Sequence, residues 1–383
     1  MPIRVLHIAK TAAPLTYGGL ESTMRQICLG LADESFEFDV VCAGGSTPGV
    51  TTLEADYARV QVLRSRVRFS TCPVPEGFVD FLRAAARRYD VFHFHAVWPF
   101  AEMIDWLAVG RGPRRVVTYH ADVLGREPFN SLYRPLLRRF LDRCDTVVAT
   151  SRAYAQSSPV LSRLERPPQA IPLALNPHSY PAVEPSRVDE WRARLGVGFF
   201  LFLGMLRPYK GLDTLIAAAA GLPAPVVLAG DGPAMPDLKR RIAALGLDNV
   251  HLLGRVDERD KVALLQAARA VVLPSRTRAE AFGIALLEGQ MFSRPLISTE
   301  LGTATSEVNR HDVTGHVVPP GDVAALRAAM DALLDDGRAE RMGQAARARF
   351  DACYRLGWVA GAYAALYRGE AGGTADTTPI AAG

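Results

Sequence analysis

Residues 270–288 read AVVLPSRTRAEAFGIALLE. The apolar run at the start, Ala270–Leu273, has the length of a buried strand. A strand that leads through a loop into a helix would place the amides of Phe282, Gly283 and Ile284 at an open helix N-terminus. Such a terminus binds anions, because its N–H groups lack helical partners and its dipole end is positive. We therefore expect an anionic ligand at this point of the chain.

Two carboxylates, Glu280 and Glu288, flank the predicted helix start. Eight helical residues span about 12 Å, so one carboxylate can lie at each end of an extended ligand with a phosphate between them. A nucleotide-sugar has this layout of sugar hydroxyls, diphosphate and ribose hydroxyls. Glutamates at this spacing also occur on ordinary solvated helix faces, so the pair needs support from other residues.

Short apolar runs alternate with amphipathic stretches in both halves of the chain. The predicted strands of the first half are Arg4–Ile8, Phe38–Ala43, Val91–His95, Arg115–Thr118 and Thr146–Ala149. The predicted helices between them are Leu20–Ala32, Gly77–Arg88, Phe100–Ala108 and Leu132–Arg143. The predicted strands of the second half are Phe199–Leu203, Val226–Ala229, Val250–Leu253, Ala270–Leu273, Pro295–Ile297 and His316–Val318. This alternation predicts an α/β fold with parallel sheets, whose ligands lie beyond the carboxyl ends of the strands.

A proline-rich segment, residues 166–187, separates the two halves and is predicted to be an irregular connector. We therefore predict two Rossmann-like, doubly wound domains, residues 1–180 and 181–352, that face each other across a cleft. Residues 353–369 are expected to form a last helix that crosses back to the first domain. Residues 370–383 are small and polar, so we predict a disordered tail.

The composition is that of a globular protein, with 383 residues of which 49% are hydrophobic and 22% charged. No apolar run is long enough for a transmembrane helix, and the N-terminus does not fit a secretory signal. The five cysteines lack metal-like spacing, which indicates reduced thiols and a cytoplasmic location. Residues 1–180 hold 21 Lys and Arg against 17 Asp and Glu, so they carry the whole net charge of +4. This excess suits an anionic membrane or acceptor but is too weak to indicate nucleic acid.

Two cations follow the predicted strand 199–203. After Gly204 come Arg207 and Lys210, whose spacing places them on one side of a tight turn. Lysine is scarce here, with only four in the chain, so a lysine at a strand end is notable. Two fixed cations can neutralise a diphosphate leaving group without a metal. The alternative is an ordinary pair of solvated cations.

The first half offers glycines and histidines at strand ends. Gly18 and Gly19 open a predicted helix, where paired glycines let a backbone approach a phosphate closely. His120 directly follows a strand, so it is a candidate ligand group. His93 and His95 end another strand, and no third partner accompanies them at metal-like spacing. We therefore predict no metal site.

Residues 132–141, LYRPLLRRFL, combine apolar periodicity with three arginines. Most such helices turn their apolar side to a core and their charged side to water. The pattern also fits a helix that lies on an anionic membrane surface.

Three motifs carry a resemblance to a known family. Residues 204–211 resemble the G-x-x-R-x-x-K-G pattern, and Glu280 to Glu288 the E-x7-E signature, of retaining family 4 glycosyltransferases with the GT-B fold. Residues 119–122, YHAD, are similar to an element of mannosyl- and rhamnosyltransferases of lipopolysaccharide synthesis. The resemblance covers about residues 3–367.

The resemblance implies a role for each candidate in the second half. Arg207 and Lys210, with the amides of Phe282–Ile284, hold the diphosphate of the donor. Glu280 contacts the donor sugar and Glu288 the ribose. In addition, Arg255 and Val256 contact the base.

For the first half, the resemblance implies that Gly18 and Gly19 lie over the donor phosphates and that His120 lies against the donor sugar and leaving group. His93 and His95, with Trp98, are candidates for the acceptor side.

The activity implied is a metal-independent transfer of mannose or rhamnose from a GDP-sugar to a lipid-linked or other saccharide acceptor. The location implied is cytoplasmic or peripheral at the inner face of the plasma membrane, in synthesis of surface polysaccharide. No cofactor is implied besides the nucleotide-sugar. A UDP-sugar donor, a GT-B-type nucleotide-sugar epimerase and a catalytically inactive scaffold subunit stay open.

Overall fold

The computed structural model describes residues 1–16, 18–32, 35–69, 72–110, 112–123 and 127–370. The chain divides into two compact units. Unit 1 contains Met1–Ala174 and Leu356–Gly383, and unit 2 contains Leu175–Arg355. The first boundary between them, after Ala174, falls within the proline-rich connector, and the second follows Arg355. The predicted disordered tail, apart from Glu370, lies outside the described residues.

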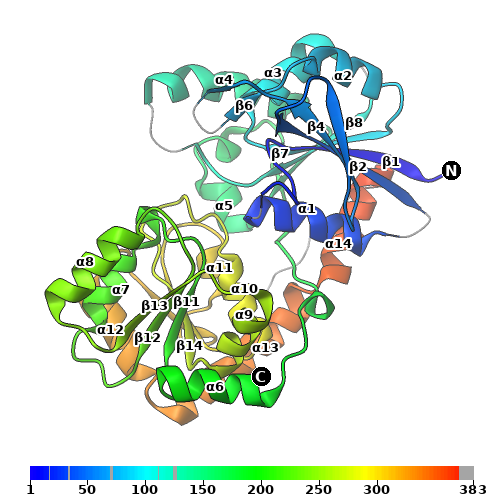
Figure 1. Ribbon diagram of the computed structural model, residues 1–383. Coiled ribbons are helices and arrows are strands. Elements are labelled where there is room, and N and C mark those ends of the chain that lie inside the picture. The colour runs from blue at the N-terminus through cyan, green and yellow to red at the C-terminus, as the bar shows by residue number, and fades with distance from the viewer. Residues whose placement is uncertain (17, 33–34, 70–71, 111, 124–126, 371–383) are drawn as a thin grey trace. The chain divides into compact units, whose positions relative to one another are not determined.

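Unit 1 is built around one sheet (Figure 1). Its strands, in spatial order, are β10 (Gln169–Ala170), β9 (Thr146–Ala149), β8 (Arg114–Tyr119), β7 (Val91–Ala96), β1 (Ile3–Ile8), β2 (Phe36–Gly45), β4 (Arg59–Arg64) and β3 (Val50–Glu54). Neighbours run parallel except β3, which is antiparallel to β4. A separate ribbon pairs β5 (Val67–Phe69) with β6 (Cys72–Val74).

Helices cover both faces of this sheet (Figure 1). One layer contains α2 (Phe78–Ala85), α3 (Pro99–Ala108) and α4 (Glu127–Arg143). The other contains α1 (Gly19–Gly30) and α14 (Leu356–Arg368). The short helix α5 (Arg152–Ser157) follows β9.

The C-terminal helix α14 packs against α1, β1 and β8, which begin more than 200 residues earlier in the sequence (Figure 1). Two buried tyrosines anchor it. The Tyr363 hydroxyl lies 2.9 Å from Thr118 Oγ1, and the Tyr367 hydroxyl lies 2.8 Å from His93 Nδ1. Because Val359 and both tyrosines also contribute to the apolar core, α14 is part of unit 1.

Unit 2 is built around a second sheet, which is parallel throughout its described strands. In spatial order these are β13 (Val250–Gly254), β12 (Val226–Ala229), β11 (Phe200–Leu203), β14 (Ala270–Leu273), β15 (Leu296–Thr299) and β16 (Gly315–Val318). The four central strands are buried along their whole length, because helices cover both faces.

Two helical layers flank this sheet (Figure 1). One contains α7 (Leu212–Ala219), α8 (Met235–Leu245) and α12 (Val323–Ala332). The other contains α6 (Pro185–Leu195), α9 (Glu258–Ala267), α10 (Ile284–Met291) and α13 (Asp336–Cys353). The short helix α11 (Thr305–Val308) packs against α10. Three-residue 3₁₀ turns are η1 (Leu161–Arg163), η2 (Pro177–Ser179) and η3 (Pro208–Lys210).

The structure confirms the α/β class and every predicted strand, with ends that differ by at most two residues. The prediction missed the hairpin of β3 and β4 at the sheet edge and the ribbon of β5 and β6. It also started α4 five residues too late, at Leu132 instead of Glu127.

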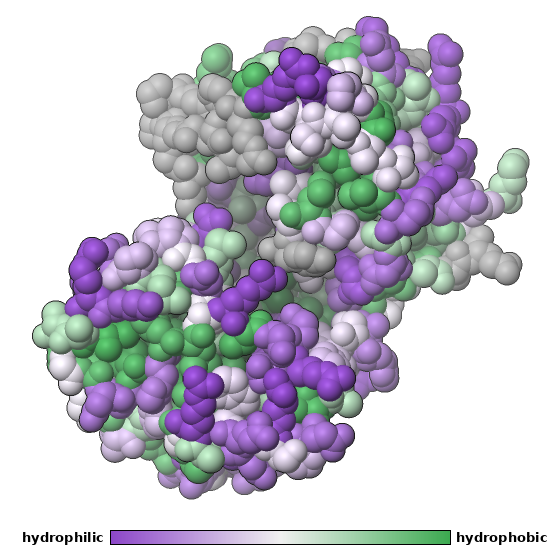
Figure 2. Space-filling model, in the orientation of Figure 1, coloured by the Kyte–Doolittle hydropathy of each residue, from purple (hydrophilic) through white to green (hydrophobic). Residues whose placement is uncertain are grey.

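Hydrophilic residues are spread over the face of both units that Figure 2 shows. Among the described residues, no helix combines the length and the apolar character that crossing a membrane requires.

Candidate active site

Both sheets contain a switch point, at which the chain reverses the direction in which it adds strands. In unit 2 this point lies between β11 and β14, since β12 and β13 follow on one side and β15 and β16 on the other. In doubly wound sheets, ligands bind beyond the carboxyl ends of the strands at such a point. The loop after β11 carries Arg207 and Lys210, and the loop after β14 carries Glu280.

Lys210 and Glu280 form an ion pair between these two loops, with Nζ against Oε2. The Ser275 hydroxyl donates to the same Oε2 over 2.9 Å. Thr303 Oγ1 donates to the main-chain carbonyl of Glu280 over 2.8 Å. The side chains of the pair are only 13% and 9% exposed, so both charges are held in place. The fold thus joins a cation and a carboxylate that are 70 residues apart in the sequence.

The N-terminus of α10 lies directly after this carboxylate. The helix begins at Ile284, and Gly283 precedes it with φ +85° and no side-chain cap. Among the described residues, the amides of Phe282, Gly283 and Ile284 have no main-chain acceptor. Three donors without a main-chain acceptor at the positive end of a helix dipole can therefore hold an anion beside Glu280.

A second lysine–glutamate pair involves the other end of the motif. Glu288 lies on α10 and is 7% exposed. Its Oε1 lies 3.0 Å from Lys261 Nζ on α9 and accepts from the Tyr180 hydroxyl over 3.0 Å. Burial alone would lower the pKa of Lys261, but the carboxylates of Glu288 and Glu258 raise it above its ordinary value. Lys261 is therefore charged and fixes the direction of the Glu288 carboxylate.

The remaining candidates of unit 2 are more exposed. Arg207 is exposed, and its Nε contacts Met205 Sδ at 3.0 Å. Arg207 and Lys210 share one turn, in which the amide of Lys210 donates to Arg207 O over 3.0 Å. Among the described residues a carboxylate holds the side chain of Lys210 but not that of Arg207. Arg255 is exposed and Val256 half-buried after β13.

Main-chain hydrogen bonds tie these loops together. The amide of Gly204, after β11, donates to Ala229 O over 3.1 Å, and the amide of Gly230 donates to Gly254 O over 2.8 Å. The loops after β11, β12 and β13 therefore form one connected edge of unit 2.

The switch point of unit 1 lies between β1 and β7. After β1, Gly18 caps α1 and Gly19 is its first residue. The buried Glu21 carboxylate accepts from Thr11 Oγ1 over 2.5 Å and from Thr16 Oγ1 over 2.8 Å. These two hydrogen bonds tie the loop before α1 to the first turn of the helix and so fix the position of the two glycines.

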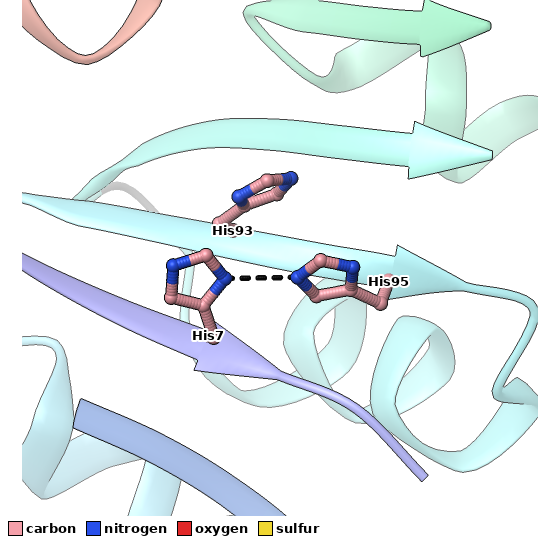
Figure 3. A group of neighbouring side chains, drawn as sticks. All are labelled: His7, His93 and His95. Carbon is pink, nitrogen blue, oxygen red and sulfur yellow. Dashed lines mark hydrogen bonds between the residues drawn. The ribbon is translucent and has the colours of Figure 1, made fainter. Parts of the chain in front are cut away.

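His120 follows β8 and is the outer member of a line of three imidazoles. Its Nε2 lies 2.9 Å from His95 Nδ1. Figure 3 shows the next contact of the line, in which His95 Nε2 lies 2.8 Å from His7 Nδ1. Burial lowers the pKa of His7 to about 3, and burial together with the charge of Lys10 lowers the pKa of His120 to about 3. Burial also lowers the pKa of His95 well below its ordinary value. All three rings are therefore neutral at pH 7.

The premise that His93 and His95 have no third partner is wrong. His7, on the neighbouring strand β1, has a ring nitrogen within 4.8 Å of one on each of them (Figure 3). Sequence spacing could not show this, because strand pairing brings His7 to β7. The rings already have partners, however. His7 bonds to His95, and the nitrogens of His93 lie 2.8 Å from Thr118 Oγ1 and the Tyr367 hydroxyl.

Trp98, which we expected on the acceptor side, belongs to the core. It is 1% exposed, its ring stacks on Phe78 at 5.2 Å, and its Nε1 donates to Pro73 O over 3.1 Å. An indole satisfied in this way contributes packing, as a buried tryptophan usually does.

Sequence analysis missed three residues that hold the candidate carboxylates, namely Ser275, Tyr180 and Lys261. The scarcity of lysine was a usable signal for Lys261, because two of the four lysines in the chain make these largely buried pairs.

Two family models match the chain. Residues 17–158 match the model described as Glycosyltransferase Family 4, and residues 187–349 match the model described as Glycosyl transferases group 1. Two curated proteins are similar over nearly the whole length. D-rhamnosyltransferase WbpZ of Pseudomonas aeruginosa is 41% identical over 91% of this chain and 91% of that protein. O-antigen chain mannosyltransferase C of Escherichia coli is 38% identical over 95% of this chain and 98% of that protein.

Solved structures show the same fold. Sucrose-phosphate synthase from Thermosynechococcus elongatus aligns with a TM-score of 0.77 and 22% identity, over 96% of this chain and 98% of that one. HepE from Anabaena, in complex with UDP and glucose, aligns with a TM-score of 0.75 and 18% identity, over 96% and 99%. The GT-B fold predicted from the motifs is therefore confirmed.

Proposed function

This chain belongs to glycosyltransferase family 4, and we propose that it transfers a hexose from a GDP-sugar to a lipid-linked saccharide of the lipopolysaccharide O antigen. The names of the relatives in Pseudomonas aeruginosa and Escherichia coli support mannose or rhamnose as the sugar and the O antigen as the product. A GDP-mannose-dependent mannosyltransferase of Corynebacterium glutamicum, 37% identical over 38% of this chain, supports GDP as the nucleotide.

The observation that carries this proposal is the arrangement at the switch point of unit 2. The buried Lys210–Glu280 pair and the unpaired amides before α10 lie at the carboxyl edge of β11 and β14. A diphosphate fits the amides and the Lys210 ammonium, and a sugar hydroxyl fits the Glu280 carboxylate. Among the described residues, Oε1 of Glu280 has no hydrogen-bond donor, so it is the atom that we assign to the sugar.

We assign the other candidate residues to successive parts of the donor. Arg207, which is exposed, reaches the diphosphate from the solvent side, and Glu288 accepts from a ribose hydroxyl while Lys261 holds it. Arg255 and Val256 lie beside the base. To Gly18, Gly19 and His120 we assign the donor contacts that the resemblance implies, the glycines with the phosphates and His120 with the sugar.

We propose that transfer retains the anomeric configuration and needs no metal ion. The acceptor hydroxyl attacks the anomeric carbon on the face that the phosphate leaves, and the bond from that carbon to the phosphate oxygen breaks. The departing phosphate takes the hydroxyl proton. The fixed Lys210 ammonium and the amides of α10 stabilise the charge that develops on this phosphate, because preorganised donors need no rearrangement during the reaction.

The donor base is tested by thermal unfolding with a panel of GDP-, UDP-, dTDP- and ADP-sugars. Free ligand at 100 times its Kd stabilises a protein by about 2.7 kcal/mol, which corresponds to a rise in Tm of roughly 5–10 °C for a unit of this size. We expect GDP-mannose or GDP-rhamnose to give the largest rise. A larger rise with a UDP-sugar would favour the alternative donor, and no rise with any of them would favour the scaffold alternative.

We also propose peripheral attachment to an anionic membrane at the cytoplasmic face. A groove of about 700 Å³ in unit 1 is lined by arginines of α4 and the segment after α5, namely Arg134, Arg138, Arg139, Arg143 and Arg163. Asp142 and Glu165 also line it, so the groove keeps a net positive charge. Leu132, 73% exposed, lies on the same helix and can enter the headgroup layer.

Vesicle flotation tests this attachment. The protein should bind phosphatidylglycerol vesicles and not phosphatidylcholine vesicles, with binding that weakens as salt rises. Each arginine near such a surface contributes about 1 kcal/mol, so the double variant Arg139→Gln/Arg163→Gln should bind about 30-fold more weakly, since every 1.4 kcal/mol is about tenfold. The matched control, Arg259→Gln/Arg341→Gln, removes two exposed arginines of unit 2. Equal losses in both variants would refute a role for the groove.

A further inference from the structure

We call the line His7–His95–His120 the imidazole array. It runs from the core of unit 1 to His120, which follows β8, and the proposed reaction uses only His120. Both hydrogen bonds of the array join one ring nitrogen directly to another. The His93 ring stacks on His95 at 4.4 Å between centroids and lies tilted against His7 at 4.8 Å, but its nitrogens bond to hydroxyl groups instead. The array is therefore one unbranched line of three rings.

Neutral rings in such a line have coupled tautomers. Each ring carries one N–H and one lone pair, and each hydrogen bond needs one of each. Only two arrangements satisfy both bonds. In the first, all three protons are on Nδ1, so His7 donates to His95 and His95 donates to His120. In the second, all three protons are on Nε2 and both bonds run the other way.

The two ends of the array decide between these arrangements. At the inner end, His7 Nε2 is buried and has no partner among the described residues, and the nearby ring of Phe38 offers no hydrogen-bonding atom. In the second arrangement His7 Nε2 would carry a buried N–H without an acceptor, whereas in the first arrangement it carries only a lone pair. Orphaned N–H groups are the rarer case in protein cores. The first arrangement is therefore preferred.

The outer end is open. His120 is only partly buried, and among the described residues its Nδ1 has no partner. Burial and, after it, the charge of Lys10 lower the pKa of this ring, so it stays neutral and carries a single proton. Lys10 is itself partly exposed, so solvent screens its charge. The choice between the two arrangements therefore rests on the unpartnered Nε2 of His7.

We propose that His7 and His95 are positioning residues that fix His120 as the Nδ1–H tautomer, so that His120 donates a hydrogen bond to an oxygen of the nucleotide-sugar. This role rests on the proposed function for what His120 contacts, but the tautomer itself is a property of the free protein. Among the described residues no group continues the array beyond His7 Nε2, so the array holds a proton in place and does not conduct one. It makes His120 a donor to the oxygen that becomes negative as the phosphate departs from the sugar.

Long-range ¹H–¹⁵N correlation spectra of histidine-labelled full-length protein at pH 7 test the assignment without substrate. We expect His7, His95 and His120 to be protonated on Nδ1. Free neutral histidine favours Nε2–H, so a ring without this constraint would give the opposite spectrum. A His120 protonated on Nε2 overturns the proposal, whether or not the protein proves to transfer sugar.

Substitutions at His95 test the coupling. In His95→Leu, His120 should shift towards Nε2–H, and kcat should fall about 10-fold or more with a smaller change in the KM of the donor, as expected when one donor to a developing charge is lost. In His95→Gln, the side-chain amide can accept a hydrogen bond from His7 and donate one to His120. His120 should therefore return to the Nδ1–H form, and most of kcat should be restored.

Thr118→Val is the matched control, because it removes a buried hydroxyl that bonds to His93 and leaves the array intact. Its His120 tautomer should not change. An unchanged tautomer in His95→Leu would contradict the coupling, and if that variant does not fold, the spectra of the wild type and His95→Gln still decide.

A metal ion is the competing use of these side chains, because buried neutral imidazoles are also metal ligands. Titration with Zn²⁺ should leave the His7, His93 and His95 signals unchanged. One equivalent of tightly bound zinc that shifts all three would replace the array with a metal centre.

Discussion

Lys210→Ala should lower kcat/KM for the sugar donor by about 10²–10³-fold, the range seen when one fixed donor to a developing oxyanion is lost. Lys210 is a largely buried cation that pairs with Glu280, shortly before the open N-terminus of α10. The loss should appear in initial rates at subsaturating donor, measured well below the Tm of each variant.

Two controls separate chemistry from folding. Lys239→Ala removes an exposed lysine on α8 and should transfer sugar at the wild-type rate. Lys210→Arg keeps a cation beside Glu280, so it should fold even if the alanine variant is unstable, and it should retain part of the activity. Near-normal transfer by a folded Lys210→Ala protein would show that this lysine does not hold the diphosphate.

Gly211→Ala should destabilise unit 2 by about 2–5 kcal/mol, because two costs add. Gly211 has φ +67°, and the left-handed region costs a residue with a Cβ about 1–2 kcal/mol. A Cβ at this position would also lie 2.0 Å from Pro274 O, and overpacking adds about 1–3 kcal/mol. This glycine thus lets the loop after β11 meet the loop after β14, which is the contact that joins Lys210 to Glu280.

Thermal unfolding of Gly211→Ala should show a Tm lower by roughly 10 °C, given about 2–4 °C per kcal/mol for a unit of this size. Gly246→Ala is the matched control, since Gly246 has φ +61° but nothing within 4 Å of an added Cβ. Gly246→Ala should lower the free energy of unfolding only by the backbone cost, about 1–2 kcal/mol. If both variants lost the same free energy of unfolding, an added Cβ at Gly211 would not clash with Pro274 O.

The sequence predicted the sheets of both units because their central strands are covered on both faces and so appear as apolar runs. Val226–Ala229 and Ala270–Leu273 matched the structure to the residue. The hairpin of β3 and β4 was missed because β3 lies at the sheet edge and alternates between exposed and half-buried residues. An alternating edge strand lacks the continuous apolar run on which the prediction depended.

Within the site, sequence reasoning found the groups that follow strands, since loop position follows from strand position. It could not find which groups pair. The partners of Glu288, namely Lys261 and Tyr180, come from separate elements. His7 was likewise missed, because it meets His95 only through the pairing of β1 with β7. Such contacts depend on the order of strands in the sheet, which apolar patterns do not specify.

Product analysis tests the central claim most directly. The protein, freed of metal ions with EDTA, is incubated with GDP-mannose or GDP-rhamnose and a lipid-linked saccharide acceptor, and the product is examined by NMR. The account predicts a lengthened acceptor whose new linkage has the anomeric configuration of the donor. Inverted linkage, free epimerised sugar nucleotide, or donor left unchanged with every acceptor would contradict it.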